Sequence, residues 1–202
     1  MTRILLAVGL WILMTVPVRA QELPRLPEVE EVPFIMSVRF YDVGGRRYRH
    51  AVEALRYAGP LGYDAVTNTM LRTYYEFSPS EQGCALRVLE LPLEVEILYP
   101  RWLGYDNAPR ADRESWDRRM HVLTVHENLH ALIAFLGAIS AYNDLASVGA
   151  RDNCESLEAI LRETVDTTND RISRWQRDYD RVTRHGMEQP GFEFNAFMDE
   201  RL

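Results

Sequence analysis

The amino-acid sequence predicts an α+β fold in which a small antiparallel sheet is followed by two long helices. Apolar residues alternate with polar ones through the first half of the folded chain, as in strands with one wet face. In the second half they recur every three or four residues, as on the buried face of a helix. Because the strands precede the helices, an alternating α/β sheet is not expected. The 202 residues, 47% of them hydrophobic and 26% charged, suffice for one compact domain.

The first twenty residues have the layout of a secretory signal peptide. Arg3 precedes an apolar, uncharged run, and Val18 and Ala20 place small residues at the expected cleavage site. The run is shorter than the roughly twenty residues that a membrane span needs, although retention as an N-terminal anchor stays open. We therefore expect an exported protein, in the periplasm or outside the cell, with no stable membrane insertion after signal cleavage.

A proline- and glutamate-rich lead-in over residues 21–33 precedes the predicted domain, which spans residues 34–202. Strands are predicted at Ile35–Val43, Ala65–Phe77 and Cys84–Tyr99, with a short helix at Tyr48–Tyr57. Gly59 and Pro60 end this helix. Pro92 lies inside the third strand, which implies an edge position, a bulge or a break into two strands.

The first long helix is predicted from Ser115 to about Val148, with Gly149 as its stop, and the second from Cys154 to about His185. Gly186 and Pro190 end the second helix.

The net charge of −7 comes from 30 acidic and 23 basic residues, and all of the basic ones are arginine. A general nucleic-acid binder needs a basic stripe that neutralises phosphates. We therefore expect no nucleic-acid partner. The oligomeric state is left open.

The chain has two cysteines, Cys84 and Cys154, so that only one pairing is possible. Export to an oxidising compartment favours a disulfide between them, and two unpaired buried thiols are the alternative.

The residues that carry chemistry lie in the first long helix, in the motif H-E-x-x-H formed by His126, Glu127 and His130. Residues four apart share one face of a helix, so both imidazoles can bind one metal ion, with the glutamate beside its open side. Such a site is typical of a single zinc ion that activates water. The sequence therefore predicts zinc at His126 and His130, with Glu127 as general base.

Catalytic zinc needs a third protein ligand. We expect His185, because the glycine after it lets the chain turn and present the imidazole inward. In a plain antiparallel hairpin, however, His185 would lie roughly 15 Å from the level of His130. The second helix must then kink, cross steeply or begin later, and Thr167-Thr168-Asn169 is the expected break. If the helix stays straight, Glu158 or Glu163 is the better third ligand.

The string Tyr179-Asp180-x-x-Thr183-x-His185-Gly186, downstream of H-E-x-x-H with a cysteine between, resembles the bacterial family of predicted secreted zinc-dependent proteases, domain-of-unknown-function family nine-two-two. Further matching positions are Tyr41, Val43, Gly45, Gly59, Pro60, Thr67, Cys84, Trp102, Trp116 and Cys154. The resemblance covers about residues 36–190 and supports His185 as the third ligand. One departure is Tyr99-Pro100 before Arg101-Trp102, where the family usually has Leu-Pro before its tryptophan.

Two functions of different class follow. The first is an exported zinc metallopeptidase with a zincin-like domain, in which Glu127 accepts a proton from water and Tyr179 steadies the oxyanion of a peptide or protein substrate. Tyr179 can equally be a core aromatic. Asp180 is expected to fix the tautomer of a ligating imidazole, or else to be a solvated surface carboxylate. The alternative function is a zinc-binding envelope protein that uses the same fold for interaction or assembly without turnover.

Overall fold

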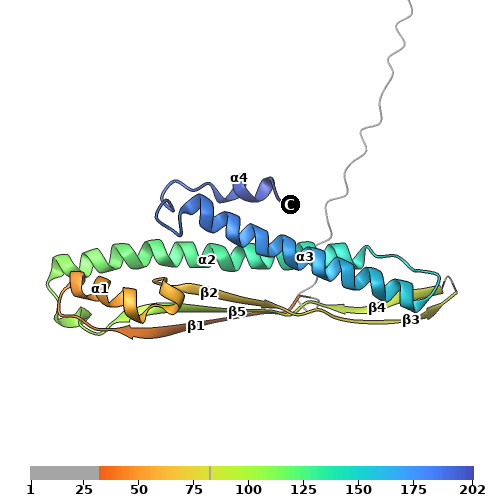
Figure 1. Cartoon of the computed structure of the whole chain (residues 1–202), viewed down its shortest axis with the longest axis horizontal. Helices are drawn as coiled ribbons and strands as arrows, with labels where there is room; N and C mark the ends of the chain where they lie inside the picture. Colours follow the sequence, from red (N-terminus) through yellow and green to blue (C-terminus); the bar gives the residue numbers. More distant parts are fainter. Residues whose placement is uncertain (1–31, 82) are drawn as a thin grey trace, which may run out of the picture.

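A computed structural model describes residues 32–81 and 83–202 as a mixed α+β protein, in which small sheets are followed by long helices as predicted (Figure 1). The predicted signal peptide and nearly all of the lead-in lie outside the described residues. The elements are, in order, β1 (Phe34–Val43), α1 (Tyr48–Ala58), η1 (Pro60–Gly62), β2 (Val66–Leu71), β3 (Tyr74–Ser80), β4 (Gly83–Glu90), β5 (Leu93–Trp102), η2 (Tyr105–Asn107), α2 (Arg110–Ala146), α3 (Cys154–Thr183) and α4 (Phe194–Asp199).

The strands form a mixed layer, and the expected single antiparallel sheet is wrong. A three-stranded sheet has the order β1-β5-β2, in which β1 is parallel to β5 and β2 antiparallel to it. The hairpin of β3 and β4 is a second, two-stranded sheet. Alternation of apolar residues predicts which face of a strand is buried but not the direction of its neighbour, which is why the parallel pair was not foreseen.

Of the three outcomes foreseen for Pro92, the break into two strands is the one observed. Leu91 and Pro92 separate β4 from β5. On the antiparallel partner chain, Arg72 and Thr73 likewise separate β2, which pairs with β5, from β3, which pairs with β4. The amide of Arg72 donates to the carbonyl of Pro92 at 3.0 Å, so the two chains stay together across the break. Proline has no amide hydrogen to donate, and the ladder is interrupted where it stands.

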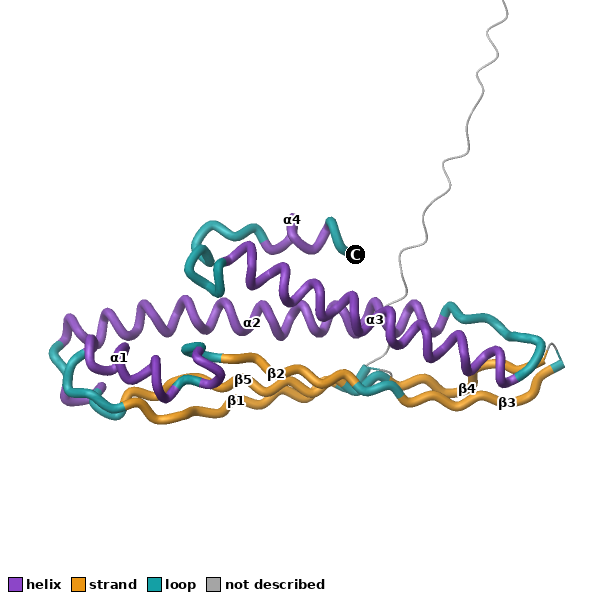
Figure 2. The backbone as a smooth tube through the Cα atoms, in the orientation of Figure 1, coloured by secondary structure: helices purple, strands orange, loops and turns teal. Residues whose placement is uncertain are grey.

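The two long helices lie over this layer, α2 along its length and α3 obliquely across α2 (Figures 1 and 2). α2 begins directly after Pro109, five residues earlier than predicted. α3 begins at Cys154, directly after the N-cap Asn153, whose side chain accepts from the amide of Ser156 at 2.8 Å. It runs without interruption through the Thr167-Thr168-Asn169 segment, so the expected break there is wrong. The oblique crossing brings the last turn of α3 over the middle of α2.

The main core lies between α2, α3 and the inner face of β5. It contains Leu93, Val95 and Ile97 of the strand, with Leu145 of α2 and Leu161 of α3. Within the described residues, α2 alone is long and apolar enough to cross a membrane by length and composition, a property that it shares with the core helices of soluble proteins. Here it is the central core helix.

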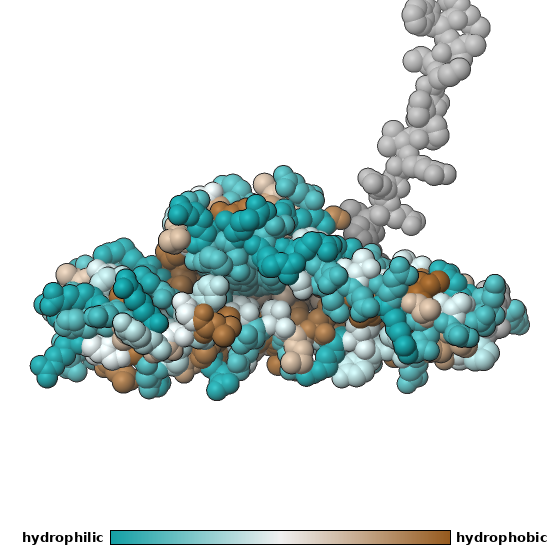
Figure 3. Space-filling view, in the orientation of Figure 1, coloured by the Kyte–Doolittle hydropathy of each residue, from teal (hydrophilic) through white to brown (hydrophobic). Residues whose placement is uncertain are grey.

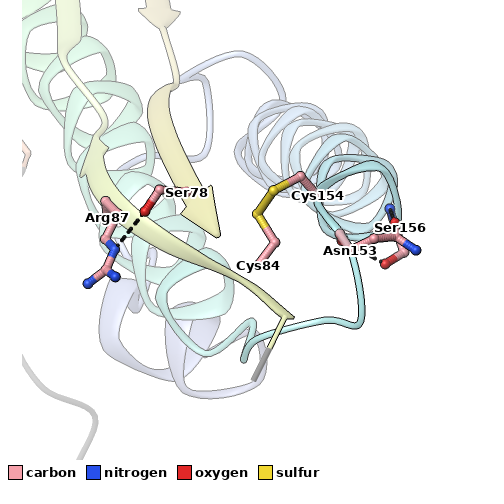
Figure 4. Close-up of a disulfide and its surroundings, with 6 residues drawn as sticks. All are labelled: Ser78, Cys84, Arg87, Asn153, Cys154 and Ser156. Carbon is pink, nitrogen blue, oxygen red and sulfur yellow. Dashed lines mark hydrogen bonds between the residues drawn. A yellow bond between two sulfur atoms is a disulfide. The ribbon is translucent and has the colours of Figure 1, made fainter. Parts of the chain in front are cut away.

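A disulfide fixes the beginning of α3 to the sheet layer. Cys84 of β4 and Cys154, the first residue of α3, form the predicted bridge (Figure 4). The loop before α3 is also held by backbone hydrogen bonds, since Cys84 and Arg151 exchange two of them at 2.7 and 2.9 Å. The start of α3 is therefore set by both covalent and backbone contacts.

Candidate metal centre

Two imidazoles of α2 meet on one face of the helix. His126 and Glu127 are almost fully buried, with 4% and 5% of their surface exposed, and His130 follows one turn later. The Nε2 atoms of His126 and His130 lie 3.2 Å apart. The four-residue spacing of the two histidines therefore brings their rings together on one face of the helix, as predicted from helical geometry.

The carboxylate of Asp180, in the last turn of α3, completes this group. Its Oδ1 atom lies 3.2 Å from Nε2 of His126 and 3.0 Å from Nε2 of His130. The three side chains form the group of potential metal ligands whose ligand atoms all lie within 4.8 Å of one another. Burial alone would raise the pKa of Asp180, but the hydrogen bonds of His126 and His130 hold this pKa well below its usual range.

Two glutamines orient the imidazoles from the opposite side. Gln176 donates through Nε2 to the carbonyl of His130 at 3.0 Å, so its Oε1 faces Nδ1 of the same histidine at 2.5 Å. Oε1 of Gln189 lies 3.2 Å from Nδ1 of His126. Each Nδ1 therefore carries the hydrogen that faces its glutamine. Each Nε2 then presents a lone pair to Asp180 when the ring is neutral, and donates a hydrogen bond to this carboxylate when the ring is protonated.

With both rings neutral, Oδ1 of Asp180 and the Nε2 atoms of His126 and His130 are all acceptors, 3.0–3.2 Å from one another. A proton or a cation must lie among them to offset the repulsion of their lone pairs. In the protein without metal, burial lowers the pKa of His130, but its hydrogen bonds to Asp180 and Gln176 outweigh this and raise the pKa overall. The chemistry of the donor set, two neutral imidazoles and one carboxylate, is equally that of a divalent metal site.

Glu127 is held beside the histidines by the edge strand β2. Oγ1 of Thr67 donates to Oε2 of Glu127 at 2.7 Å and also lies 3.1 Å from its backbone carbonyl. This contact fixes the direction of the carboxylate, which lines the same cleft as both histidines. The glutamate of the motif is thus buried and oriented, and within residues 32–81 and 83–202 it forms no ion pair.

A cleft of about 540 Å³ lies over the group. β2 contributes Val66, Thr67 and Thr69 to one wall, and α3 contributes Ser173, Gln176 and Asp180 to the other. Because β2 is an edge strand, one wall of the cleft is a sheet edge.

His185, the predicted third ligand, lies next to the group but outside it. Its Nδ1 is 3.4 Å from Oδ1 of Asp180, its side chain is half exposed, and its ring packs on Tyr63. Arg184, His185 and Gly186 all have positive φ and turn the chain after α3. Gly186 packs against the ring of His126, where a Cβ atom would come within 3.3 Å of Cγ. The turn thus supports His126, while Asp180 makes the contacts that were expected of His185.

Tyr179 is a core residue, which was the second possibility foreseen for it. It is fully buried, stacks on His126, and donates its hydroxyl to Oε1 of Gln189 at 2.5 Å. Burial raises the pKa of its phenol well above the usual range. Its hydroxyl does not line the cleft and positions Gln189 instead.

The acidic alternatives, Glu158 and Glu163, are distant from the histidines. Glu158 pairs with Arg162 near the disulfide end of α3, roughly 30 Å along the helix from Asp180. Glu163 is exposed on the same helix.

Thr67, Gln176 and Gln189 were not identified from the sequence as site residues. Gln176 is four residues before Asp180 and therefore shares its helix face, a spacing that could have suggested it. Thr67 and Gln189 reach the site only through tertiary structure.

Fold and site together define a mixed α+β protein with a helix-borne His-His-Asp group that could bind a metal ion. The chain belongs to the family described as "Bacterial protein of unknown function (DUF922)", whose model matches residues 38–186. The matched region includes the motif of α2 and Asp180, whereas Gln189 follows it. No curated protein and no solved structure matches the chain.

Proposed function

We propose that the protein is an exported zinc metallopeptidase with a zincin-like domain, in which His126, His130 and Asp180 hold the ion. The observation that carries this proposal is the convergence of two Nε2 atoms and one carboxylate oxygen within 3.0–3.2 Å, beside the buried Glu127.

The distances fit a tetrahedral zinc site. Ligand atoms at about 2.0–2.1 Å from zinc are separated from one another by roughly 3.3 Å. Three protein ligands leave the fourth position for water, as in catalytic and unlike most structural sites. The glutamines support the same assignment, because ligating histidines usually donate their other ring nitrogen to a fixed acceptor.

When bound, zinc lowers the pKa of a water molecule and polarises a substrate carbonyl. Glu127 would accept the proton of that water and deliver it to the leaving amine. Thr67 holds the glutamate in this orientation through its 2.7 Å hydrogen bond. Tyr179, through Gln189, keeps His126 in the tautomer that presents Nε2.

The edge of β2 supports a peptide substrate. An extended peptide can add to an exposed strand through backbone hydrogen bonds, with its side chains in pockets on either side. In the cleft, such a peptide would run along β2 past Thr67 and therefore past Glu127.

The disulfide is compatible with an exported protein. Together with the signal peptide predicted for residues 1–20, it supports action in the periplasm or outside the cell.

The alternative function, a zinc-binding envelope protein without turnover, uses the same three ligands. Glu127 favours the peptidase, because a structural site needs no oriented carboxylate beside it and normally closes all four positions with protein ligands.

The test compares the wild type with Glu127→Gln and the matched control Glu163→Gln, an exposed glutamate of α3. We expect about one zinc per chain in all three proteins by elemental analysis, and hydrolysis of a peptide library by the wild type and the control only. Zinc binding without hydrolysis in the wild type would favour the envelope protein. Absence of zinc from the purified wild type, after incubation with the ion, would contradict both functions.

A further inference from the structure

We propose that the outer edge of β1 pairs with β1 of a second copy, so that two chains form one continuous sheet with antiparallel strands at its centre.

β1 is a long and unprotected edge strand. In the part of the chain that the structure describes, it pairs on one side only, with β5. Five large apolar side chains on it have between 42% and 62% of their surface exposed: Phe34, Ile35, Met36, Val38 and Phe40. Figure 3 shows hydrophobic side chains over the part of the layer where β1, β5 and β2 lie.

The devices that usually protect an edge strand are absent from this stretch. From Phe34 to Val38 it carries no charge and no proline, the chain has no lysine anywhere, and the register with β5 contains no bulge. The first charged residue, Arg39, is paired with Glu96 of its own sheet at 3.1 Å. A flat apolar edge of this kind is a template for another strand.

The backbone groups of β1 that face away from β5 belong to four of its five exposed apolar residues. The carbonyl of Pro33 accepts from the amide of Leu93, the first residue of β5, at 2.8 Å, and the carbonyl of Val43 accepts from the amide of Leu103, directly after β5, at 3.0 Å. In a parallel ladder the odd-numbered residues between them then also point their backbone groups at β5. The even-numbered residues Phe34, Met36, Val38 and Phe40 point their amides and carbonyls outward.

These residues are complementary to themselves in one antiparallel register. If Ser37 of each copy lies on the two-fold axis, Phe34 faces Phe40 and Met36 faces Val38 of the other copy. Each of these is a hydrogen-bonded pair, because all four residues have outward backbone groups. Cross-strand aromatic and aromatic–aliphatic pairs stabilise antiparallel strands. A second copy of β1, running antiparallel, therefore matches the first in both its apolar side chains and its hydrogen-bonding backbone groups.

The area is that of a weak dimer. Aromatic side chains bury on the order of 150–250 Å² each, so the half-exposed Phe34 and Phe40 together contribute roughly 150–250 Å² per copy. Ile35, Met36 and Val38 are smaller and add less each. Two copies together then stay below about 1,200 Å², the range of weak and transient interfaces. The cleft lies at β2, the opposite edge of the sheet, and stays open in the dimer.

The first test is the oligomeric state by sedimentation velocity. We expect the wild type to be dimeric at tens of micromolar and Val38→Lys to be monomeric, with unchanged circular dichroism. Val88→Lys, at an exposed valine of β4, is the matched control and should stay dimeric. A wild type that is monomeric at hundreds of micromolar overturns the proposal, as does a dimer that persists in Val38→Lys.

The second test fixes the register. Cys84 and Cys154 are bonded to each other, so an introduced cysteine is the single free thiol. Ser37→Cys should oxidise to a covalent dimer, because residues on the axis of a non-hydrogen-bonded pair have Cα atoms about 4.5 Å apart. Ile35→Cys should not, because the two positions are separated by roughly 13 Å along the strands. Equal cross-linking of both variants would overturn the register.

Discussion

Asp180 is the residue on which the imidazoles of the site converge, since a single oxygen of its carboxylate lies within 3.4 Å of His126, His130 and His185. The sequence analysis expects His185 as the third ligand and Asp180 as the group that orients an imidazole. In the structure the aspartate lies against both imidazoles of α2, and His185 contacts the aspartate from outside this group.

Asp180→Asn tests this order at the scale of one residue. Loss of the carboxylate charge should lower zinc affinity by about 100-fold or more, because a ligand matters at least as much as the groups that orient it. Competition with a zinc chelator of known affinity measures the change. The matched control is Asp178→Asn on the same helix, whose carboxylate pairs with Arg181 and Arg201 and should leave affinity unchanged.

His185→Ala completes the comparison. We expect a smaller loss of zinc affinity than in Asp180→Asn, because the imidazole contacts the aspartate and not the two Nε2 atoms. A larger loss in His185→Ala would assign the third ligand to the histidine.

Single residues differ in how far their roles can be predicted. His126, Glu127 and His130 lie on one helix, where spacing alone determines which side chains meet. Thr67 is one of the positions that match the family resemblance, but no spacing connects it to the motif of α2, and Gln189 lies beyond the matched region. Their importance comes from contacts between segments that lie far apart in the chain, which local periodicity does not encode.

At the scale of elements, α3 connects the disulfide to the candidate metal centre. Its first residue is bonded to β4 through Cys84, and its last turn carries Asp180, about 39 Å further along the axis. The helix thereby connects the covalent anchor of the domain to the candidate metal centre.

Replacing both cysteines, as in Cys84→Ser with Cys154→Ser, tests this connection. The bridge joins residues 70 positions apart, so its loss should lower the free energy of unfolding by roughly 4 kcal/mol. Urea denaturation measures this. Zinc affinity of the folded variant should stay within a few-fold of the wild type, because the hydrogen bonds between Cys84 and Arg151 still hold the start of the helix. A hundredfold loss of affinity would show that the disulfide itself positions Asp180.

The existence and order of the elements could be predicted more completely than their arrangement. The long helices were predicted within a few residues of their observed ends, because apolar periodicity and the residues at their ends are local signals. The parallel pairing of β1 with β5 and the oblique crossing of α3 over α2 depend on side-chain packing between elements. No residue within these elements predicts that arrangement. α4 has only 6 residues, too few for a helical periodicity to be recognised in the sequence.

At the scale of the whole molecule, the site joins parts of the chain that are distant in sequence. Thr67 comes from the sheet, Glu127 from α2, Asp180 from α3, and Gln189 from the turn after it. Zinc bound to this group would therefore bind the folded state alone.

Thermal unfolding with and without the ion tests this expectation. At free zinc 100 times its dissociation constant, the folded state should gain about 2.7 kcal/mol, and chelation should reverse the gain. Magnesium prefers oxygen ligands and should have no comparable effect. Equal stabilisation of Asp180→Asn by zinc would contradict binding at this group.

Gln189 lies in the turn beyond α3, and its Oε1 atom faces Nδ1 of His126 and accepts from the hydroxyl of Tyr179. The tautomer of the first histidine therefore depends on a segment outside both long helices. A substitution confined to that turn would alter the group without touching any of its three side chains.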